Sequence, residues 1–238
     1  MSNYLFVLSY ARLDRDEDKH DCIRTFYQDL IRELRMQKGL PEGNIGFFDG
    51  SDIEPGEAWS EQLVDALCTS RAFIPVYSPT YFTKEYCGKE WAIFRSRLGS
   101  YAEHSTEAIN LPLIFPVLLL APDQIGALPQ AAVDIQYMHD DFPSVYGEEG
   151  LRYMMRLSGY KDDYERFLTK FARKLIRATD THHLPPTTNA LHIQQVENAF
   201  QHSTRMDSEE TNLPANVGPR FVQFVFVAGR RDEIRKRL

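Results

Sequence analysis

The stretch that decides the fold runs from residue 71 to residue 97 and reads RAFIPVYSPTYFTKEYCGKEWAIFRSR. It opens with a short apolar run, residues 72–77, of the kind that forms a strand buried on both faces of a sheet. Ser78 and Pro79 follow. Because serine is a good N-cap and proline suits the first helical turn, we expect a helix to begin there.

That helix would carry an aromatic ring and a carboxylate on one face. Tyr86 and Glu90 are four residues apart, a spacing that places their side chains one above the other. Such a pair can belong to a ligand site. It also occurs on ordinary surface helices, where a solvated glutamate paired with Arg71 or Lys84 contributes little to stability. The stretch alone leaves both interpretations open.

Strands and helices alternate through the first 178 residues. Besides residues 72–77, apolar runs predict strands at residues 4–9, 45–48 and 113–120 and a weaker fifth strand at residues 133–137. Helical periodicity predicts a helix that begins at residue 22 and is ended by Gly39 and Pro41. It also predicts helices from about residue 57, at 148–157 and at 162–177. Alternation of this kind implies right-handed βαβ units. The sequence therefore predicts an α/β fold with a flavodoxin-like, five-stranded parallel sheet, ordered 2-1-3-4-5 and flanked by helices.

Ligands of such sheets bind at the carboxyl ends of the strands, near the switch in strand order. That rule selects three loops, at residues 9–16, 49–56 and 77–81. The chain has neither a G-x-G-x-x-G fingerprint nor a Walker motif. A nucleotide site would therefore have to be built from these loops.

Composition narrows the functional classes. The net charge of −7 argues against broad attraction to nucleic acid or to an acidic membrane. The apolar run at residues 111–121 is broken by two prolines and is shorter than the roughly 20 residues of a spanning helix. The three cysteines, Cys22, Cys68 and Cys87, are too widely spaced to suggest a disulfide framework or a zinc site. With no signal peptide apparent, we expect a cytoplasmic protein without a metal or a bound cofactor.

The amino-acid composition of the chain changes after residue 178. Residues 179–219 are rich in Pro, Thr, Asn, Gln and Ser and predict a linker, with a short helix near residues 191–200. Residues 221–227 (FVQFVFV) predict a further strand. We expect residues 220–238 to begin a second α/β domain that is truncated here. The strand could instead join the edge of the first sheet or pair with another chain.

Four separated motifs, in the same order, resemble those of TIR domains, and the resemblance covers roughly residues 1–178. They are YLFVLSY at residues 4–10, FDG and PG at 48–50 and 55–56 with Trp59, the pattern S-x-x-Y-F…Y-C-x-x-E-W at 78–91, and YG and GLR at 146–147 and 150–152. The arrangement resembles bacterial TIR-like proteins, including the FxsC type, in which a second region follows the TIR unit.

The resemblance implies a function for Glu90. Many TIR domains hydrolyse or cyclise NAD+, and the glutamate of the C-x-x-E pattern is their catalytic residue. The aromatic residue four positions earlier is usually tryptophan, whereas this chain has Tyr86, which keeps a flat ring for stacking. Other TIR domains are interaction modules without catalysis. TIR enzymes commonly self-associate to complete their sites, so homotypic association is also expected.

The remaining candidate residues follow the strands at the loop edge. The candidate substrate-binding residues are Ser9, Tyr10, Arg12, Asp49, Trp59 and Tyr86. Tyr10 and Arg12 could pack on nicotinamide and steer a phosphate, or be ordinary loop residues. Asp49 could bond ribose hydroxyls or cap its loop. Trp59 could line the site, although a tryptophan on an apolar helix face is more often in the core.

Two functional hypotheses from different classes follow. The first is a TIR-domain NAD+ glycohydrolase or cyclase, in defence or signalling, with Glu90 stabilising the transition state. The second is a non-catalytic signalling adaptor that assembles through residues 49–56 and the neighbouring helices. A third, weaker hypothesis is a receptor for a nucleotide signal.

Overall fold

The computed structural model describes residues 4–15, 21–40, 43, 45–48, 61–104, 112–187 and 196–201. Four parallel strands form its sheet, in the order β2-β1-β3-β4. They are β1 (Phe6–Ser9), β2 (Gly46–Phe48), β3 (Ala72–Tyr77) and β4 (Val117–Leu118). Almost every residue in them is buried, as expected for a parallel sheet covered on both faces.

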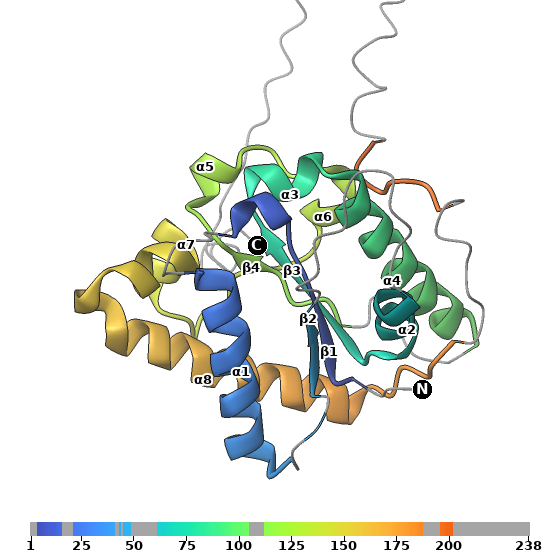
Figure 1. Cartoon of the computed structure of the whole chain (residues 1–238), viewed down its shortest axis with the longest axis horizontal. Helices are drawn as coiled ribbons and strands as arrows, with labels where there is room; N and C mark the ends of the chain where they lie inside the picture. Colours follow the sequence, from blue (N-terminus) through green and yellow to red (C-terminus); the bar gives the residue numbers. More distant parts are fainter. Residues whose placement is uncertain are drawn as a thin grey trace, which may run out of the picture. The chain divides into compact units, whose positions relative to one another are not determined.

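Helices cover the two faces of the sheet (Figure 1). On one face, α1 (Cys22–Lys38), α7 (Ser144–Arg156) and α8 (Lys161–Thr181) pack on one another. On the other, α2 (Glu61–Thr69) packs against α4 (Glu85–His104). The shorter elements are η1 (Arg12–Asp14), α3 (Pro79–Thr83), α5 (Pro122–Ile125), α6 (Gln130–Val133) and η2 (Ser158–Tyr160). The predicted α/β class, with a parallel sheet flanked by helices, is confirmed.

The predicted fifth strand at residues 133–137 is wrong. α6 ends at Val133, and residues 134–137 pair with no strand in the described part of the chain. Pro129 occupies the N-cap of α6 and two alanines follow, so the local sequence favours a helical turn. The fourth strand is also shorter than predicted. Pro116 has no N–H for a strand ladder, and upstream of it a single bridge joins Ile114 to Phe73.

The helix after β3 is two helices. The Ser78 Oγ atom accepts a hydrogen bond from the backbone N–H of Tyr81 at 2.9 Å, which confirms the predicted N-cap. α3 nevertheless ends after five residues, because Lys84 is extended (φ −90°, ψ 123°). α4 then begins at Glu85 and carries Glu90. The description of α2 begins at Glu61, so the helix start that was predicted near residue 57 lies outside the described residues.

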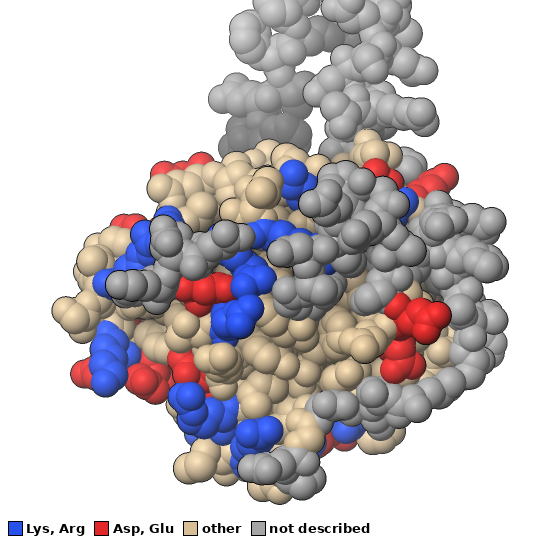
Figure 2. Space-filling model, viewed as in Figure 1, with Lys and Arg blue, Asp and Glu red and all other residues tan. Residues whose placement is uncertain are grey.

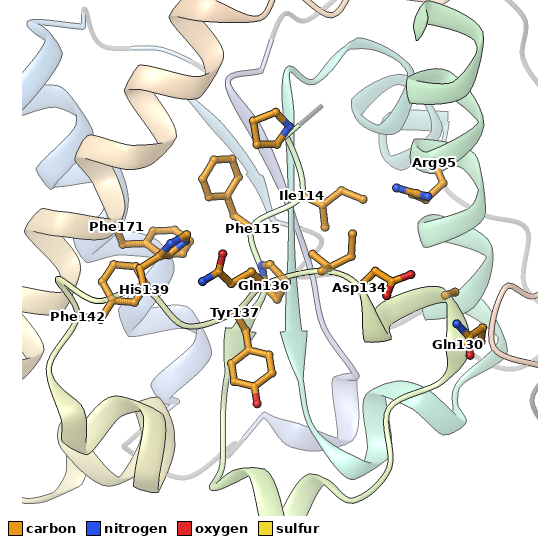
Figure 3. Close-up of a pocket in the computed structure, with 14 residues that line it drawn as sticks. Arg95, Ile114, Phe115, Gln130, Asp134, Gln136, Tyr137, His139, Phe142 and Phe171 are labelled. Carbon is orange, nitrogen blue, oxygen red and sulfur yellow. The ribbon is translucent and has the colours of Figure 1, made fainter. Parts of the chain in front are cut away.

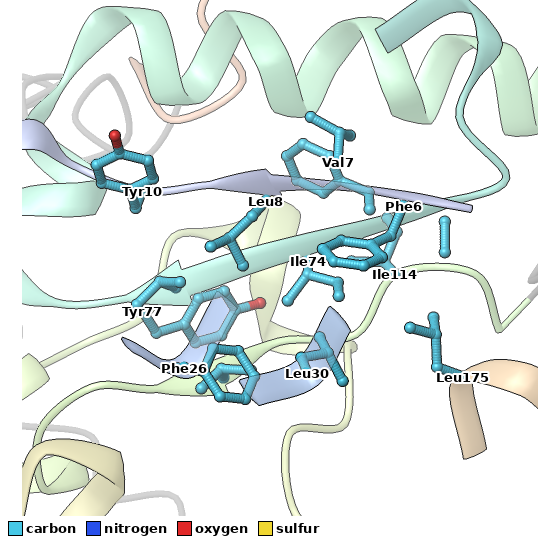
Figure 4. Packing of buried hydrophobic residues seen from close by; sticks show 14 of the residues in the cluster. Phe6, Val7, Leu8, Tyr10, Phe26, Leu30, Ile74, Tyr77, Ile114 and Leu175 are labelled. Carbon is cyan, nitrogen blue, oxygen red and sulfur yellow. The ribbon is translucent and has the colours of Figure 1, made fainter. Parts of the chain in front are cut away.

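Side chains from distant segments meet in one core (Figure 4). On the α1 face of the sheet, the Phe26 ring lies 5.8 Å from the ring of Phe171 in α8. On the α4 face, the Phe73 ring stacks on Phe94 at 5.3 Å. Aromatic side chains therefore cover both faces of the sheet. Polar groups can gather instead at the ends of the strands.

Segments beyond the predicted domain boundary contact this unit. α8 continues to Thr181, and the backbone N–H of Thr187 donates to the carbonyl of Cys68 at 3.0 Å. Residues 196–201 pack on α4. These residues fall in the stretch predicted to be a linker. Its remaining part and the predicted second domain at residues 220–238 lie outside the described residues, as does the first half of the predicted short helix at 191–200. The second half, residues 196–200, is described and is not helical.

Charged side chains on the face drawn in Figure 2 are of mixed sign, with Lys and Arg grouped over α1 and the helices beside it. Some basic side chains of the described residues are paired with acidic neighbours, such as Arg32 with Asp29 at 2.8 Å and Lys174 with Asp141 at 3.0 Å. Exposed pairs of this kind contribute at most about 1 kcal/mol each. Within the described residues, no helix is both long and apolar enough to cross a membrane.

Candidate functional site

The carboxyl ends of β1 and β3 bring Ser9, Tyr81 and Glu90 together. Ser9 is the last residue of β1, Tyr81 lies in α3 and Glu90 in the second turn of α4. The Ser9 hydroxyl donates to Glu90 Oε2, and Ser9 Oγ lies 3.0 Å from the Tyr81 hydroxyl. A hydroxyl has one hydrogen to donate. Since Ser9 gives its hydrogen to Glu90, the Tyr81 O–H must donate to Ser9.

Glu90 is buried, with 6% of its surface exposed. The solvated surface glutamate that the sequence also allowed is therefore wrong. Arg71, one of the partners suggested for it, instead donates to the carbonyl of Thr179 and contacts His183. Removing a carboxylate from water is unfavourable unless hydrogen bonds compensate. The Tyr81–Ser9–Glu90 chain supplies part of that compensation and fixes the position of Oε2.

Tyr86 joins α4 to the loop after β1. Its hydroxyl accepts the backbone N–H of Arg12 at 2.9 Å, and the Arg12 guanidinium carbon lies 6.0 Å from the ring centroid. Burial is the main cause that raises the pKa of Tyr86, so the phenol stays protonated at neutral pH. Tyr86 and Glu90 thus face the same loop, at residues 9–12, as their four-residue spacing predicts.

Tyr10 is placed differently from the other candidates. Its ring stacks on Phe48 with 4.9 Å between centroids and 10° between planes, and 4% of the residue is exposed. That is ordinary core packing, one of the two interpretations that the sequence left open. Asp49 and Trp59 lie outside the described residues.

Sequence reasoning assigned no role in the site to Asp14 or Tyr81. The Ser78 hydroxyl donates to Asp14 Oδ2 while Ser78 Oγ accepts the Tyr81 N–H, so three residues tie the loop after β1 to the start of α3. Burial raises the pKa of the Asp14 carboxyl, although hydrogen bonds from Ser78 and Thr80 act in the opposite direction. The serine N-cap was visible in the sequence, but its contact with Asp14 depends on the fold.

Cys87 lies between the two candidates on α4 and is completely buried. Burial is the largest cause that raises the pKa of its thiol well above the usual value, followed by the nearby charges of Glu90 and Asp14. A protonated thiol is a poor nucleophile. The prediction that Cys87 is a packing residue agrees with this environment.

A separate cavity of about 400 Å³ lies beside β4 (Figure 3). Arg95 of α4 and Asp134 stand toward one end, and Phe171 of α8 lies with His139 and Phe142 at the other. Burial lowers the pKa of His139. None of the candidate residues that the structure describes lines this cavity. Across the described residues, no cluster of three or more His, Cys, Asp or Glu side chains is arranged to hold a metal ion.

Comparison with known proteins identifies the family. The family model described as "TIR domain" matches residues 6–142, which is 137 of the 238 residues. None of the curated proteins matches the chain. Among solved structures, the TIR domains of the activated Roq1 resistosome, which directly recognises the pathogen effector XopQ, are 16% identical, with 87% of this chain and 99% of that chain covered and a TM-score of 0.28. Because the family model spans more than half of the sequence, from β1 to the residues just before α7, the chain belongs to the TIR domain family.

Proposed function

We propose that this protein cleaves the nicotinamide–ribose bond of NAD+, with Glu90 stabilising the transition state. The observation that carries the proposal is a buried carboxylate at the carboxyl ends of β1 and β3, where ligands of parallel sheets bind. Hydroxyl groups from two other elements hold that carboxylate in place. TIR domains include NAD+ hydrolases, which supports the substrate.

The reaction requires few catalytic groups. The nicotinamide ring in NAD+ is cationic, so when its bond to the ribose breaks, the electron pair goes to the ring nitrogen and a neutral group leaves. No general acid is required, in contrast to an ordinary glycosidase, which uses two carboxylates. Water then attacks the ribose carbon, loses one proton to the solvent and gives ADP-ribose. In a cyclase, a nitrogen of the adenine would attack instead.

Glu90 would act through its charge. Positive charge develops on the ribose ring as nicotinamide departs, and a fixed carboxylate in a site of low dielectric stabilises it far better than solvent would. The same carboxylate could accept hydrogen bonds from ribose hydroxyls. The Tyr81–Ser9–Glu90 chain favours this role because it fixes the carboxylate before the substrate arrives, so little reorganisation is needed.

The other candidate residues would bind the substrate. We assign the ring of Tyr86 to contact nicotinamide and the guanidinium of Arg12 to a phosphate, because both lie beside the loop that carries Ser9. We also assign Asp49 to the ribose hydroxyls and Trp59 to the wall of the site. Association between TIR domains would complete the site, as in other enzymes of the family.

The test is nicotinamide release. Purified protein is incubated with NAD+, with and without a crowding agent that favours assembly, and nicotinamide, ADP-ribose and its cyclic form are separated by chromatography. We expect release by the natural sequence and none above background by Glu90→Ala. No release by either protein under crowding would contradict the proposal and leave a non-catalytic TIR interaction module. Equal release by both would overturn the assignment of Glu90.

A further inference from the structure

Residues 196–201, here called the clip, return to the helix that carries Glu90. They lie more than 50 residues beyond the part matched by the TIR family model, and in Figure 1 they form the orange segment beside α3 and α4. Asn198 and Phe200 are both buried, with 8% and 6% of their surfaces exposed. Burial of an asparagine and a phenylalanine in so short a segment indicates that the clip binds to a specific site on the domain.

Phe200 enters an aromatic cluster at the base of the site. Its ring centroid lies 5.7 Å from that of Tyr81, 5.3 Å from that of Phe82 and 5.7 Å from that of Trp91. Aromatic pairs at such distances contribute about 0.5–1.5 kcal/mol each beyond the area that they bury. Tyr81 is also the residue whose hydroxyl reaches Ser9, so a single ring contact separates the clip from the hydroxyl chain that holds Glu90.

Gly88 of α4 receives the other half of the clip. Its carbonyl accepts the backbone N–H of Ala199 at 3.3 Å. A Cβ atom at this position would overlap Asn198 Oδ1, lie 2.7 Å from Asn198 Cγ and 3.1 Å from the Phe200 ring. Asn198 Oδ1 is not free to swing away without loss, since it accepts the backbone N–H of Phe200 at 2.9 Å. The clip therefore fits only against a glycine.

We propose that the clip positions the catalytic carboxylate: Phe200, docked against Gly88 and Tyr81, holds Tyr81 where its hydroxyl orients Ser9 and, through Ser9, Glu90. Phe200 and Asn198 are positioning residues in this scheme, since neither touches Glu90. The catalytic consequence rests on the function proposed above, whereas the docking and its effect on the Glu90 carboxylate do not.

Two alanine substitutions on one helix provide a matched test. Gly88→Ala should expel the clip, whereas Gly99→Ala, also in α4, meets no atom within 4 Å and serves as the control. Both changes gain the same helix propensity, about 0.5–1 kcal/mol. Phe200→Ala removes the ring alone. Phe200→Tyr keeps the ring, so this variant should behave like the natural sequence. The double change Asn198→Ala with Phe200→Ala gives a further full-length variant that leaves every residue of α4 intact.

Docking is read from Trp91, which is 1% exposed and borders Phe200. In a Trp59→Phe background, used for fluorescence only, acrylamide should quench Trp91 more strongly in Gly88→Ala, Phe200→Ala and the double variant than in the natural sequence or Gly99→Ala. Positioning is read from the carboxyl ¹³C resonance of Glu90, assigned by its absence from Glu90→Gln. The same three variants should shift it, because the hydrogen bond from Ser9 is altered.

Activity supplies the third measurement. If the protein cleaves NAD+, the three variants should lower kcat about tenfold or more, with a smaller change in KM, because misplacing a reacting group costs rate more than binding. Failure of the proposed function alone would appear as no cleavage by any protein, with the fluorescence and resonance changes still present. The inference would be overturned if Trp91 responds while the Glu90 resonance does not, if neither responds, or if kcat rises when the clip is displaced.

Discussion

Burial of the Asp14 side chain is unfavourable for its charged form. The carboxylate accepts a hydrogen bond from Ser78, yet burial outweighs that bond and raises its pKa above the ordinary value of 3.8. A raised pKa means that the folded protein binds this proton more tightly than the unfolded chain does. The contribution of Asp14 to stability is therefore most favourable at low pH and falls as the pH rises from 3.8 through the folded-state pKa.

Asp14→Asn removes the charge and keeps an oxygen that can accept the Ser78 hydroxyl. We expect the variant to unfold at a higher temperature than the natural sequence at pH 7, with the difference shrinking toward pH 4, where Asp14 is increasingly protonated in both states. Thermal unfolding followed by circular dichroism across this range is the measurement. The exposed Asp123→Asn is the control. A lower unfolding temperature at pH 7 would show instead that the interactions of the charged carboxylate outweigh the cost of its burial.

At this scale, the sequence predicted some of the site and not the rest. The common face of Tyr86 and Glu90 follows from helical periodicity alone. The contact of Glu90 with Ser9 does not, because it joins residues 81 positions apart and requires β1 to pair with β3 in one register, with Ser9 opposite Pro75. The packing of Tyr10 on Phe48 likewise depends on the neighbouring strand.

The kink of α7 is the feature that fixes the β4 edge of the sheet. Gly150 has φ +79°, inside what is otherwise one helix. Around it, the backbone N–H of Arg152 donates to the carbonyl of Leu119, and the Tyr146 hydroxyl accepts the N–H of Leu118, each at 3.0 Å. α7 thus satisfies backbone groups at the end of β4.

Gly150→Ala should be strongly destabilising for two reasons. Positive φ is unfavourable for alanine, at about 1–2 kcal/mol, and its Cβ would lie 2.6 Å from the carbonyl oxygen of Leu120. We expect a loss of about 2–4 kcal/mol in the free energy of unfolding, measured with urea. Gly159→Ala, which meets no atom within 4 Å, should change it by less than about 0.5 kcal/mol. Equal effects of the two changes would contradict this account of the kink.

The elements that were predicted correctly are those with a clear period and clear ends. α1 ends at Gly39, which adopts φ +64° and caps the helix as expected. The fifth strand failed even though Val133, Ile135 and Tyr137 alternate with polar residues. The run is only five residues long, and a helical turn with Pro129 at its N-cap takes the first of them. The break at Lys84 also escaped notice, since nothing in its residue type forbids a helix.

At the scale of the whole molecule, the described residues beyond α8, 182–187 and 196–201, pack on the rest of the domain. Arg97 of α4 is buried and donates to the carbonyls of Leu67, Ser70 and Pro185, which fastens residues near 185 to α2 and α4. Burial lowers the pKa of Arg97 to about 10, so it remains charged at neutral pH. Composition alone predicted a linker there. Proline and polar residues are common both in linkers and in segments that are held by specific hydrogen bonds, so composition does not distinguish the two.

Two glutamates on one helix show whether Glu90 carries the cleavage of NAD+. Glu90→Gln keeps the size of the buried side chain and an oxygen for the Ser9 hydroxyl, but removes the charge. Glu85→Gln makes the same change at an exposed position of α4, where the side chain pairs with Lys89. Nicotinamide release is measured for both under assembling conditions. We predict a loss of at least about 100-fold for Glu90→Gln and nearly unchanged release for Glu85→Gln. Release by Glu90→Gln at the rate of the natural sequence would contradict the account.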